Sequence, residues 1–473
     1  MSSGQTETAP RPQRHREATL YHPLAGAGAR ASAPAAAGAT DGAALLAALR
    51  AQALSAYEAA ELPVWRRSGF WTTSFAPLRL EALEVLRHEH SGQADAQVPL
   101  PAVAERTLPQ RQRAGRIVQL DGSVVAVELA EDLREKGVRL CSLQDAADEG
   151  HEAFVSWYSR RLTADRHKLE AANAALWTGG AFLHVPAGVV VEHPFEIVHV
   201  VGAAGSEQHA RVLIVGGQTS EFAVHEYTLA EEFTGQALHT EGFELYLEDG
   251  ARCRLAHFQD LGSGEVFDAT TRFVGVGRDA YCHWLPALLG GHLTRQHLEL
   301  AVMGPGGDMA FRGIFFADGD ETLDTFAVDL HEVGPSGGDV HWRGAAAGSA
   351  RASMEGLIKI DPGAQQSHTY LQIHTVMLSP KARIDAIPSV LVSADDVSAS
   401  HGGSVGELDE DVIFYMQSRG LDRAAAVRVL VEGFFEPVLG ELADEPLQGV
   451  VRARIAEKLA AAREEIEAYA AGR

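Results

Sequence analysis

The residues best suited to chemistry lie in one stretch, from Ser393 to Gly420. His401 stands there among small residues, between Ser400 and the glycine pair 402–403. Because small neighbours cannot cover an imidazole, His401 is free to bind a metal ion or a partner. The alternative is a solvated surface histidine. An amphipathic helix is expected to follow and to end at Gly420, where positive φ is needed.

Other polar clusters carry weaker signals. Most of the 21 histidines fall singly on strand-like segments, which is typical of surface or hydrogen-bonded core histidines. The arrangement of a facial metal site, an HxH pair closely followed by a Glu, is not seen. Paired carboxylates in 318–329 are compatible with a polysaccharide-cleaving or calcium site, but their stretch looks like a solvated loop. These acids are Asp318, Asp320, Glu321, Asp324 and Asp329.

Nucleotide and thiol chemistry have little support. No GxxxxGK[ST] loop occurs, so we expect no nucleotide bound by this chain. The three cysteines, Cys141, Cys253 and Cys282, are far apart without CxxC spacing. This pattern excludes a disulfide framework and a zinc ribbon, and it suits a reducing cytoplasm.

Composition excludes further classes. The chain has 473 residues, is 46% hydrophobic and has a formal net charge of −24. Such a charge repels nucleic acid and anionic membranes. No apolar run is long enough for a membrane helix, and the first residues lack the apolar core of a secretory signal. We expect a cytoplasmic protein.

The chain divides into four regions by its patterns. Residues 1–40 are rich in Ala, Gly, Pro, Ser and Thr, which predicts a disordered segment. Residues 41–175 form a mixed, largely helical region that begins with a helix capped by Asp41 and includes a hairpin at Asp121-Gly122. Residues 176–407 are strand-like, and residues 408–473 are helical.

The strand-like region repeats one device: a polar corner, then a small or apolar residue, then an alternating strand. Ala251, Ala280 and Met309 follow such corners about 29 residues apart, with less even spacing later. Helical patterns are nearly absent between 180 and 405, which argues against βαβ units. We therefore predict a mainly β protein with a right-handed parallel β-helix core flanked by N-terminal and C-terminal helices. A jelly-roll or cupin-like barrel is the competing architecture.

The helical region after Gly420 carries a broad apolar stripe. Such a stripe packs on its own domain or forms a groove for a partner. Its members are Val427, Leu430, Val431, Phe434, Phe435, Val438 and Leu439.

The run ADDVSASHGGSVGELDEDVIFYMQSRG (394–420) resembles the C-terminal signature of the SufB/SufD family, scaffold proteins of iron–sulfur cluster assembly. Residues 169–194 are similar to the family's entry strand, 349–392 to its penultimate rungs, and 66–74 loosely to an N-terminal element. Ser400-His401-Gly402-Gly403 and Arg383-Ile384-Asp385 resemble SufD more than SufB, which carries a cluster-building cysteine near the latter segment.

The resemblance implies a non-catalytic scaffold with no catalytic residue. It implies a heterodimer with a SufB-like subunit through the last rungs, and a SufC-like ABC ATPase on the C-terminal helices. His401 would be a cluster or iron ligand at the SufB interface, for a transient iron–sulfur cluster shared with that subunit. A reduced flavin is also associated with the family's complex, at an unknown site, and a homodimer is compatible with the resemblance. The implied partner contacts are Val397, Ser400, Gly402, Gly406, Arg419, Phe434 and Phe435.

Two positions depart from the family pattern. Ala399 stands where the family usually has a cysteine, so a thiolate there cannot be essential to this chain. Gly403 replaces an alanine and loosens the corner. Ala399 keeps open the alternative of an interaction protein of the same fold without cluster chemistry. A second alternative is a β-helix carbohydrate-active enzyme, against which the missing secretory signal counts.

Overall fold

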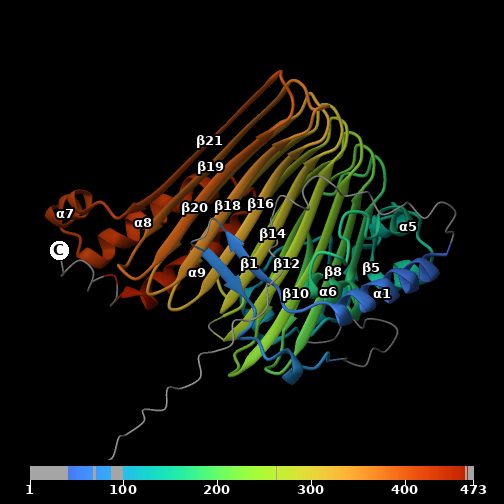
Figure 1. Ribbon diagram of the computed structural model, residues 1–473, viewed down its shortest axis with the longest axis horizontal. Coiled ribbons are helices and arrows are strands. Elements are labelled where there is room, and N and C mark those ends of the chain that lie inside the picture. Colours follow the sequence, from blue (N-terminus) through green and yellow to red (C-terminus); the bar gives the residue numbers. More distant parts are fainter. Residues whose placement is uncertain (1–40, 68–70, 87–99, 263, 464–465, 467–473) are drawn as a thin grey trace, which may run out of the picture.

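A computed structural model of the chain describes residues 41–67, 71–86, 100–262, 264–463 and 466. The segment 1–40, predicted to be disordered, lies outside the described residues. The predicted β-helix is confirmed: two long sheets of parallel strands stack into a solenoid with helices at both ends (Figure 1).

Helices occupy the two ends of the described chain, and no described helix is long and apolar enough to cross a membrane. The helices are α1 (Gly42–Ala59), a 3-10 turn (Leu80–Ala82), α2 (Ala102–Thr107), α3 (Glu131–Glu135), α4 (Leu143–Asp148), α5 (Glu152–Trp157), α6 (Lys168–Leu176), α7 (Glu410–Ser418), α8 (Arg423–Leu439) and α9 (Glu445–Ala461).

Strands make up the middle of the chain. Before the solenoid proper come β1 (Val64–Arg67), β2 (Trp71–Ser74), β3 (Gly115–Leu120), β4 (Ser123–Leu129) and β5 (Arg139–Ser142). The solenoid strands are β6 (Ala181–Val185), β7 (Phe195–Val201), β8 (Glu207–Gly216), β9 (Glu221–Ala230), β10 (Gln236–Leu247), β11 (Arg252–Asp260), β12 (Glu265–Val276), β13 (Tyr281–Leu288), β14 (Leu293–Val302), β15 (Asp308–Ala317), β16 (Thr322–His331), β17 (Gly337–Ala346), β18 (Arg351–Ile360), β19 (Ser367–Met377), β20 (Arg383–Val392) and β21 (Val397–Glu407).

Successive strands of the solenoid alternate between the two sheets. One sheet has the order β20-β18-β16-β14-β12-β10-β8-β6-β5, and the other runs β21-β19-β17-β15-β13-β11-β9-β7-β3-β4. Solenoid neighbours within each sheet are parallel; for example, Gln236 of β10 pairs with Glu265 of β12. A jelly-roll or cupin-like barrel is built from antiparallel strands, so the competing architecture is wrong.

The repeated corners place small apolar residues inside the solenoid. Ala251, Ala280 and Met309 each follow a polar turn, and each is fully buried in the core between the two sheets. From there the strands alternate, and every second side chain enters this interior. We call the space between the two sheets the lumen.

The N-terminal end of the solenoid is closed by antiparallel strands and helices. β4 pairs antiparallel with β3, and β5 pairs antiparallel with β6. The predicted hairpin is present, with Asp121 and Gly122 both at positive φ. Helix α1 begins as predicted, because the Asp41 carboxylate accepts a hydrogen bond from the Ala44 amide.

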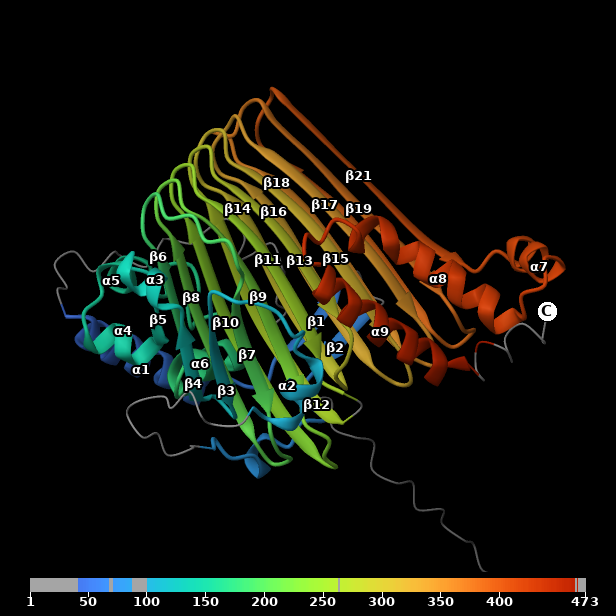
Figure 2. The ribbon, with the colours of Figure 1, turned by 180° about the vertical axis from the view of Figure 1, so that it is seen from behind.

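Helices α8 and α9 lie on the outer face of the ten-stranded sheet, and α7 projects past its end (Figure 2). Val427, Val431 and Leu439 of α8 share one buried cluster with Ile314 and Ala345 of that sheet. The apolar stripe therefore packs on the chain's own sheet, the first of its two predicted uses.

Helix α6 begins at an unusual N-cap, His167. Its Nδ1 atom accepts a hydrogen bond from the Glu170 amide, which requires an unprotonated nitrogen. Burial, with the nearby Arg166 and Arg295, lowers the pKa of His167 to about 4 although Glu170 opposes the shift. The neutral ring is therefore the folded form.

We predict that His167 makes the fold acid-sensitive and that His167→Asn reduces this sensitivity. A folded pKa below the unfolded value gives stability that is complete above about pH 6.5 and is lost as the pH falls toward 4. The His167 contribution between pH 7 and pH 5 is roughly 2 kcal/mol. Asparagine caps without titrating in this range. Melting temperatures measured from pH 8 to pH 4.5 should fall less steeply for the variant, and parallel curves would contradict the assignment.

Candidate functional site

The predicted SufB-facing residues lie on one strand, the last of the solenoid. Val397, Ser400, His401, Gly402 and Gly406 all belong to β21, the terminal strand of the ten-stranded sheet. On one side β21 pairs with β19, and on the other side no described strand follows it. The structure therefore brings these five residues together along a free sheet edge.

His401 lies in the middle of this edge strand and faces the lumen side. It pairs in register with Leu371, whose side chain is buried in the lumen core. His401 itself is exposed, because no described rung covers it. Within the described chain its imidazole has no hydrogen-bond partner. Ala399 packs against the lumen core two residues earlier, so a cysteine there would share a face with His401.

The lumen is open to solvent at this end. Ile358 and Ile360 of β18 are fully buried, yet Val390 and Val392, their neighbours on β20, are 40% and 39% exposed. Val405 of β21 is also exposed. Valines of the last rung are therefore uncovered at lumen positions whose β18 counterparts are buried.

Gly403 lies where the two last strands face each other. A Cβ atom built on it would lie 3.6 Å from Cγ of Pro388, an ordinary van der Waals contact. Its φ is not in the left-handed region, so an alanine fits the backbone without strain.

We predict that Gly403→Ala stabilises the chain by roughly 0.5 kcal/mol, because alanine restricts the unfolded chain and packs on Pro388. Thermal unfolding monitored by circular dichroism measures the effect. A lowered melting temperature would show that this corner needs glycine.

The other three predicted partner residues lie on the C-terminal helices. Arg419 follows α7, is exposed, and its Nη2 donates a hydrogen bond to Tyr415 Oη (3.0 Å). Phe434 is partly buried beneath the Arg343 guanidinium. Phe435 is only 1% exposed and packs on the chain's own sheet, so a direct partner contact would require α8 to leave that sheet.

An exposed aromatic pair on α7 was not among the predicted partner residues. Phe414 is 73% exposed and Tyr415 is 56% exposed, whereas Ile413 between α7 and the core is fully buried. Both aromatics belong to the family signature in the sequence. The amphipathic pattern alone does not show which apolar side chains remain exposed to solvent.

The acids between 318 and 329 do not converge on a groove. Asp318 and Glu321 both form ion pairs with the buried ammonium group of Lys458. Asp324 pairs with Arg295, and Asp329 lies beside His331 on the lumen side. These separate roles do not support the alternative of a carbohydrate-cleaving carboxylate pair in this segment.

The three cysteines are buried. Cys253 and Cys282 are register partners on neighbouring rungs. Burial, and the contact with Cys282, raise the pKa of Cys253 well above its usual range, and burial raises the pKa of Cys141 to about 12. Protonated, buried thiols are poor metal ligands and poor nucleophiles.

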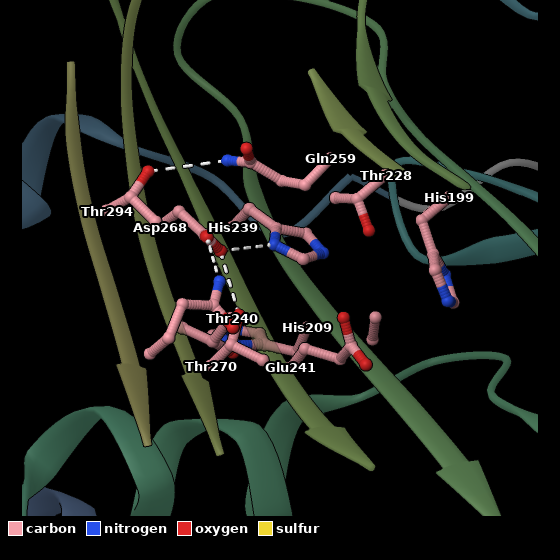
Figure 3. Close-up of polar contacts among 12 residues, drawn as sticks. His199, His209, Thr228, His239, Thr240, Glu241, Gln259, Asp268, Thr270 and Thr294 are labelled. Atoms are coloured by element: carbon pink, nitrogen blue, oxygen red, sulfur yellow. Dashed lines mark hydrogen bonds and ion pairs between the residues drawn. The ribbon is translucent and has the colours of Figure 1, made fainter. Parts of the chain in front are cut away.

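A polar network inside the lumen is the feature that the sequence patterns did not indicate. Arg272 of β12 is fully buried and contacts Glu226 of β9 and Glu241 of β10. His239 Nδ1 lies 2.8 Å from Asp268 Oδ1, and Figure 3 marks this contact with a dashed line. All these side chains enter the space between the sheets.

The network shifts the pKa values of its two glutamates in opposite directions. Burial opposes ionisation of Glu226, but Arg272 and a hydrogen bond with His199 hold the pKa of Glu226 well below its usual range. Burial and the neighbouring Glu226 raise the pKa of Glu241 despite Arg272. Burial also lowers the pKa of His199, so this imidazole is neutral.

Fold and site together define a parallel β-helix protein, closed at its N-terminal end, with an open last rung and an exposed C-terminal helix. Residues 199–434 match the family described as "SUF system FeS cluster assembly, SufBD core domain", and residues 37–197 match "SufBD protein N-terminal region". The chain belongs to the SufB/SufD family of iron–sulfur cluster assembly proteins.

Two relatives illustrate this membership. The chain is 31% identical to the iron–sulfur cluster assembly protein SufD of Bacillus subtilis (strain 168), over 70% of this chain and 76% of the relative. It is 25% identical to an iron–sulfur cluster assembly SufBD family protein of Staphylococcus haemolyticus (strain JCSC1435), over 70% of this chain and 71% of the relative. Within the family the chain is most like SufD, as the sequence motifs predict.

Proposed function

We propose that this chain is the SufD-like scaffold subunit of a cytoplasmic iron–sulfur cluster assembly complex. It pairs with a SufB-like subunit through β20 and β21, and a SufC-like ABC ATPase binds its C-terminal helices. It catalyses no reaction alone. The open last rung is the observation that carries this proposal.

The free edges of β20 and β21 support the pairing. A strand at a sheet edge presents unpaired backbone N–H and C=O groups, which natural proteins usually cover or blunt. Here the edges are long, and the adjoining lumen stripe of Val390, Val392 and Val405 is exposed. A partner that ends in a similar rung satisfies both the backbone groups and the apolar surface.

The position of His401 supports a role for it in holding the nascent cluster. The ring is exposed on the lumen side of the edge strand, where a SufB-like partner would lie. One imidazole makes a weak iron site, and Ala399 supplies no thiolate. The remaining ligands therefore come from the partner. A reduced flavin belongs to the proposed complex, without an assigned site on this chain.

The surface of α7 supports a second partner. Phe414 and Tyr415 are exposed on a helix that projects beyond the sheet (Figure 2), and the Arg419 guanidinium donates a hydrogen bond to Tyr415 Oη. Aromatic and arginine side chains are enriched where proteins bind one another. We assign this surface to the ATPase.

Co-expression with SufB-like and SufC-like subunits, followed by anaerobic cluster reconstitution, tests the proposal. We predict that His401→Ala lowers the cluster yield several-fold while the complex still assembles, because only a ligand is lost. His368→Ala is the matched control, since His368 is exposed on β19, the sheet neighbour of β21, and faces outward.

The outcomes separate the parts of the proposal. An unchanged yield with His401→Ala removes the ligand role but leaves the scaffold role. Failure to co-purify with both subunits refutes the scaffold role. Self-association through the same edge in place of SufB binding would make this chain a homodimer.

A further inference from the structure

The lumen network gathers more negative than positive side chains. Glu226, Glu241 and Asp268 offer three carboxylates, and Arg272 is the guanidinium among them. Asp268 is satisfied by His239, Thr270 and Gln296. Buried carboxylates without matching positive charge are costly, so this group needs protons or a cation.

Three side chains of the network face one another as metal ligands do. One ligand atom each from His199, Glu226 and Glu241 lies within 4.8 Å of the other two. They come from β7, β9 and β10, and therefore from both sheets of the solenoid. Figure 3 shows the Glu241 carboxylate directed to the side on which His199 lies.

Arg272 orients the two carboxylates without using all of their oxygens. Its Nη1 contacts Glu226 Oε2, and its Nη2 donates to Glu241 Oε2 at 2.7 Å. Glu226 Oε1 lies 3.2 Å from His199 Nε2. Glu241 Oε1 and His199 Nδ1 are buried with no hydrogen-bond partner among the described residues.

We propose that His199, Glu226 and Glu241 bind one divalent transition-metal cation inside the solenoid. Imidazole with two carboxylates suits Mn²⁺, Fe²⁺ or Zn²⁺. One divalent cation together with Arg272 balances the three carboxylates. Arg272 then acts as an outer partner that fixes the ligand oxygens, and the ion cross-links the two sheets. This site is separate from His401 and from the cluster of the proposed function.

Metal content of the purified full chain tests the site. The chain is produced in defined medium supplemented with Mn²⁺, Fe²⁺ or Zn²⁺ in turn, anaerobically for iron, and is purified without immobilised metal. Mass spectrometry for metals should find about one equivalent of one of these ions per chain. A metal-free, fully folded chain from all three media overturns the proposal and shows that protons and water neutralise the network.

Matched variants locate the metal. The double variant Glu226→Gln/Glu241→Gln should lose the metal at least about tenfold and melt at a lower temperature. Glu244→Gln is the control, because Glu244 is a buried carboxylate of the same β10 strand that pairs with Arg211 on the other face. It should keep the metal, and so should His401→Ala.

If the double variant does not fold, His199→Gln replaces it, since this single change removes the imidazole and keeps both carboxylates. Metal retained by a folded ligand variant, or lost equally from Glu244→Gln, overturns the site. Metal lost from His401→Ala alone would place the ion at the edge strand and also overturn it.

Discussion

Replacing Arg272 by methionine is expected to destabilise the folded chain by roughly 3–5 kcal/mol. Arg272 is fully buried and contacts Glu226 and Glu241, and its guanidinium lies over the Phe243 ring at 5.0 Å. Methionine fills much of the volume but leaves two carboxyl groups without their counter-charge. Urea unfolding followed by circular dichroism measures the loss.

Two further variants check the physical reason for this loss. Arg278→Met should change the free energy of unfolding by less than about 0.5 kcal/mol. The Arg278 side chain is exposed, and its Nε lies 3.9 Å from Asp249 Oδ2. Adding Glu226→Gln and Glu241→Gln to Arg272→Met should recover part of the stability, since the uncompensated carboxylates are gone. If Arg272→Met were as stable as the wild type, the contacts of Arg272 with the two glutamates would not stabilise the fold.

The architecture was predictable because it follows from local rules. Polar corners followed by Ala251, Ala280 and Met309 indicate turns that return a strand to a common core, and all three are buried there. The hairpin at Asp121-Gly122 and the Asp41 cap are equally local. Such signals need only a few neighbouring residues.

The lumen network was not predictable, because rung register creates it. Glu226, Glu241 and Arg272 lie on three different strands, and each looks in sequence like an outward-facing polar residue of an alternating strand. Only the stacking of β9, β10 and β12 turns them toward one another. A single sequence does not show which of two strand faces a polar residue occupies when both faces are buried.

Which side chains of the C-terminal helices are exposed was predicted only in part. The apolar stripe of α8 predicted either packing on its own domain, which the structure shows, or a partner groove, and it does not identify which apolar side chains remain exposed. Phe435 is buried against the sheet, whereas Phe414 of α7 is exposed. The orientation of each helix on the solenoid decides this, and it depends on contacts distant in sequence.

Replacing Val390 and Val392 together by lysine is expected to weaken binding of the SufB-like subunit by roughly 100-fold. Both valines lie at the uncovered lumen stripe of β20, and a partner rung that covers them would have to bury two ammonium groups. In the isolated chain both lysines remain in solvent, so its folding should hardly change. Co-purification and analytical ultracentrifugation measure the binding, and melting temperature reports the fold.

Val190→Lys is the control that distinguishes disruption of the interface from a general effect of added positive charge. Val190 is 63% exposed and precedes β7 near the closed N-terminal end, far along the solenoid from β20. It should leave SufB binding unchanged. Unaltered binding of the Val390→Lys/Val392→Lys variant would mean that the last rung is not the contact surface. Because this rung exposes valines at positions that β18 buries, the exposed edge would then need another cover. A second copy of the chain is the first candidate to test, by sedimentation.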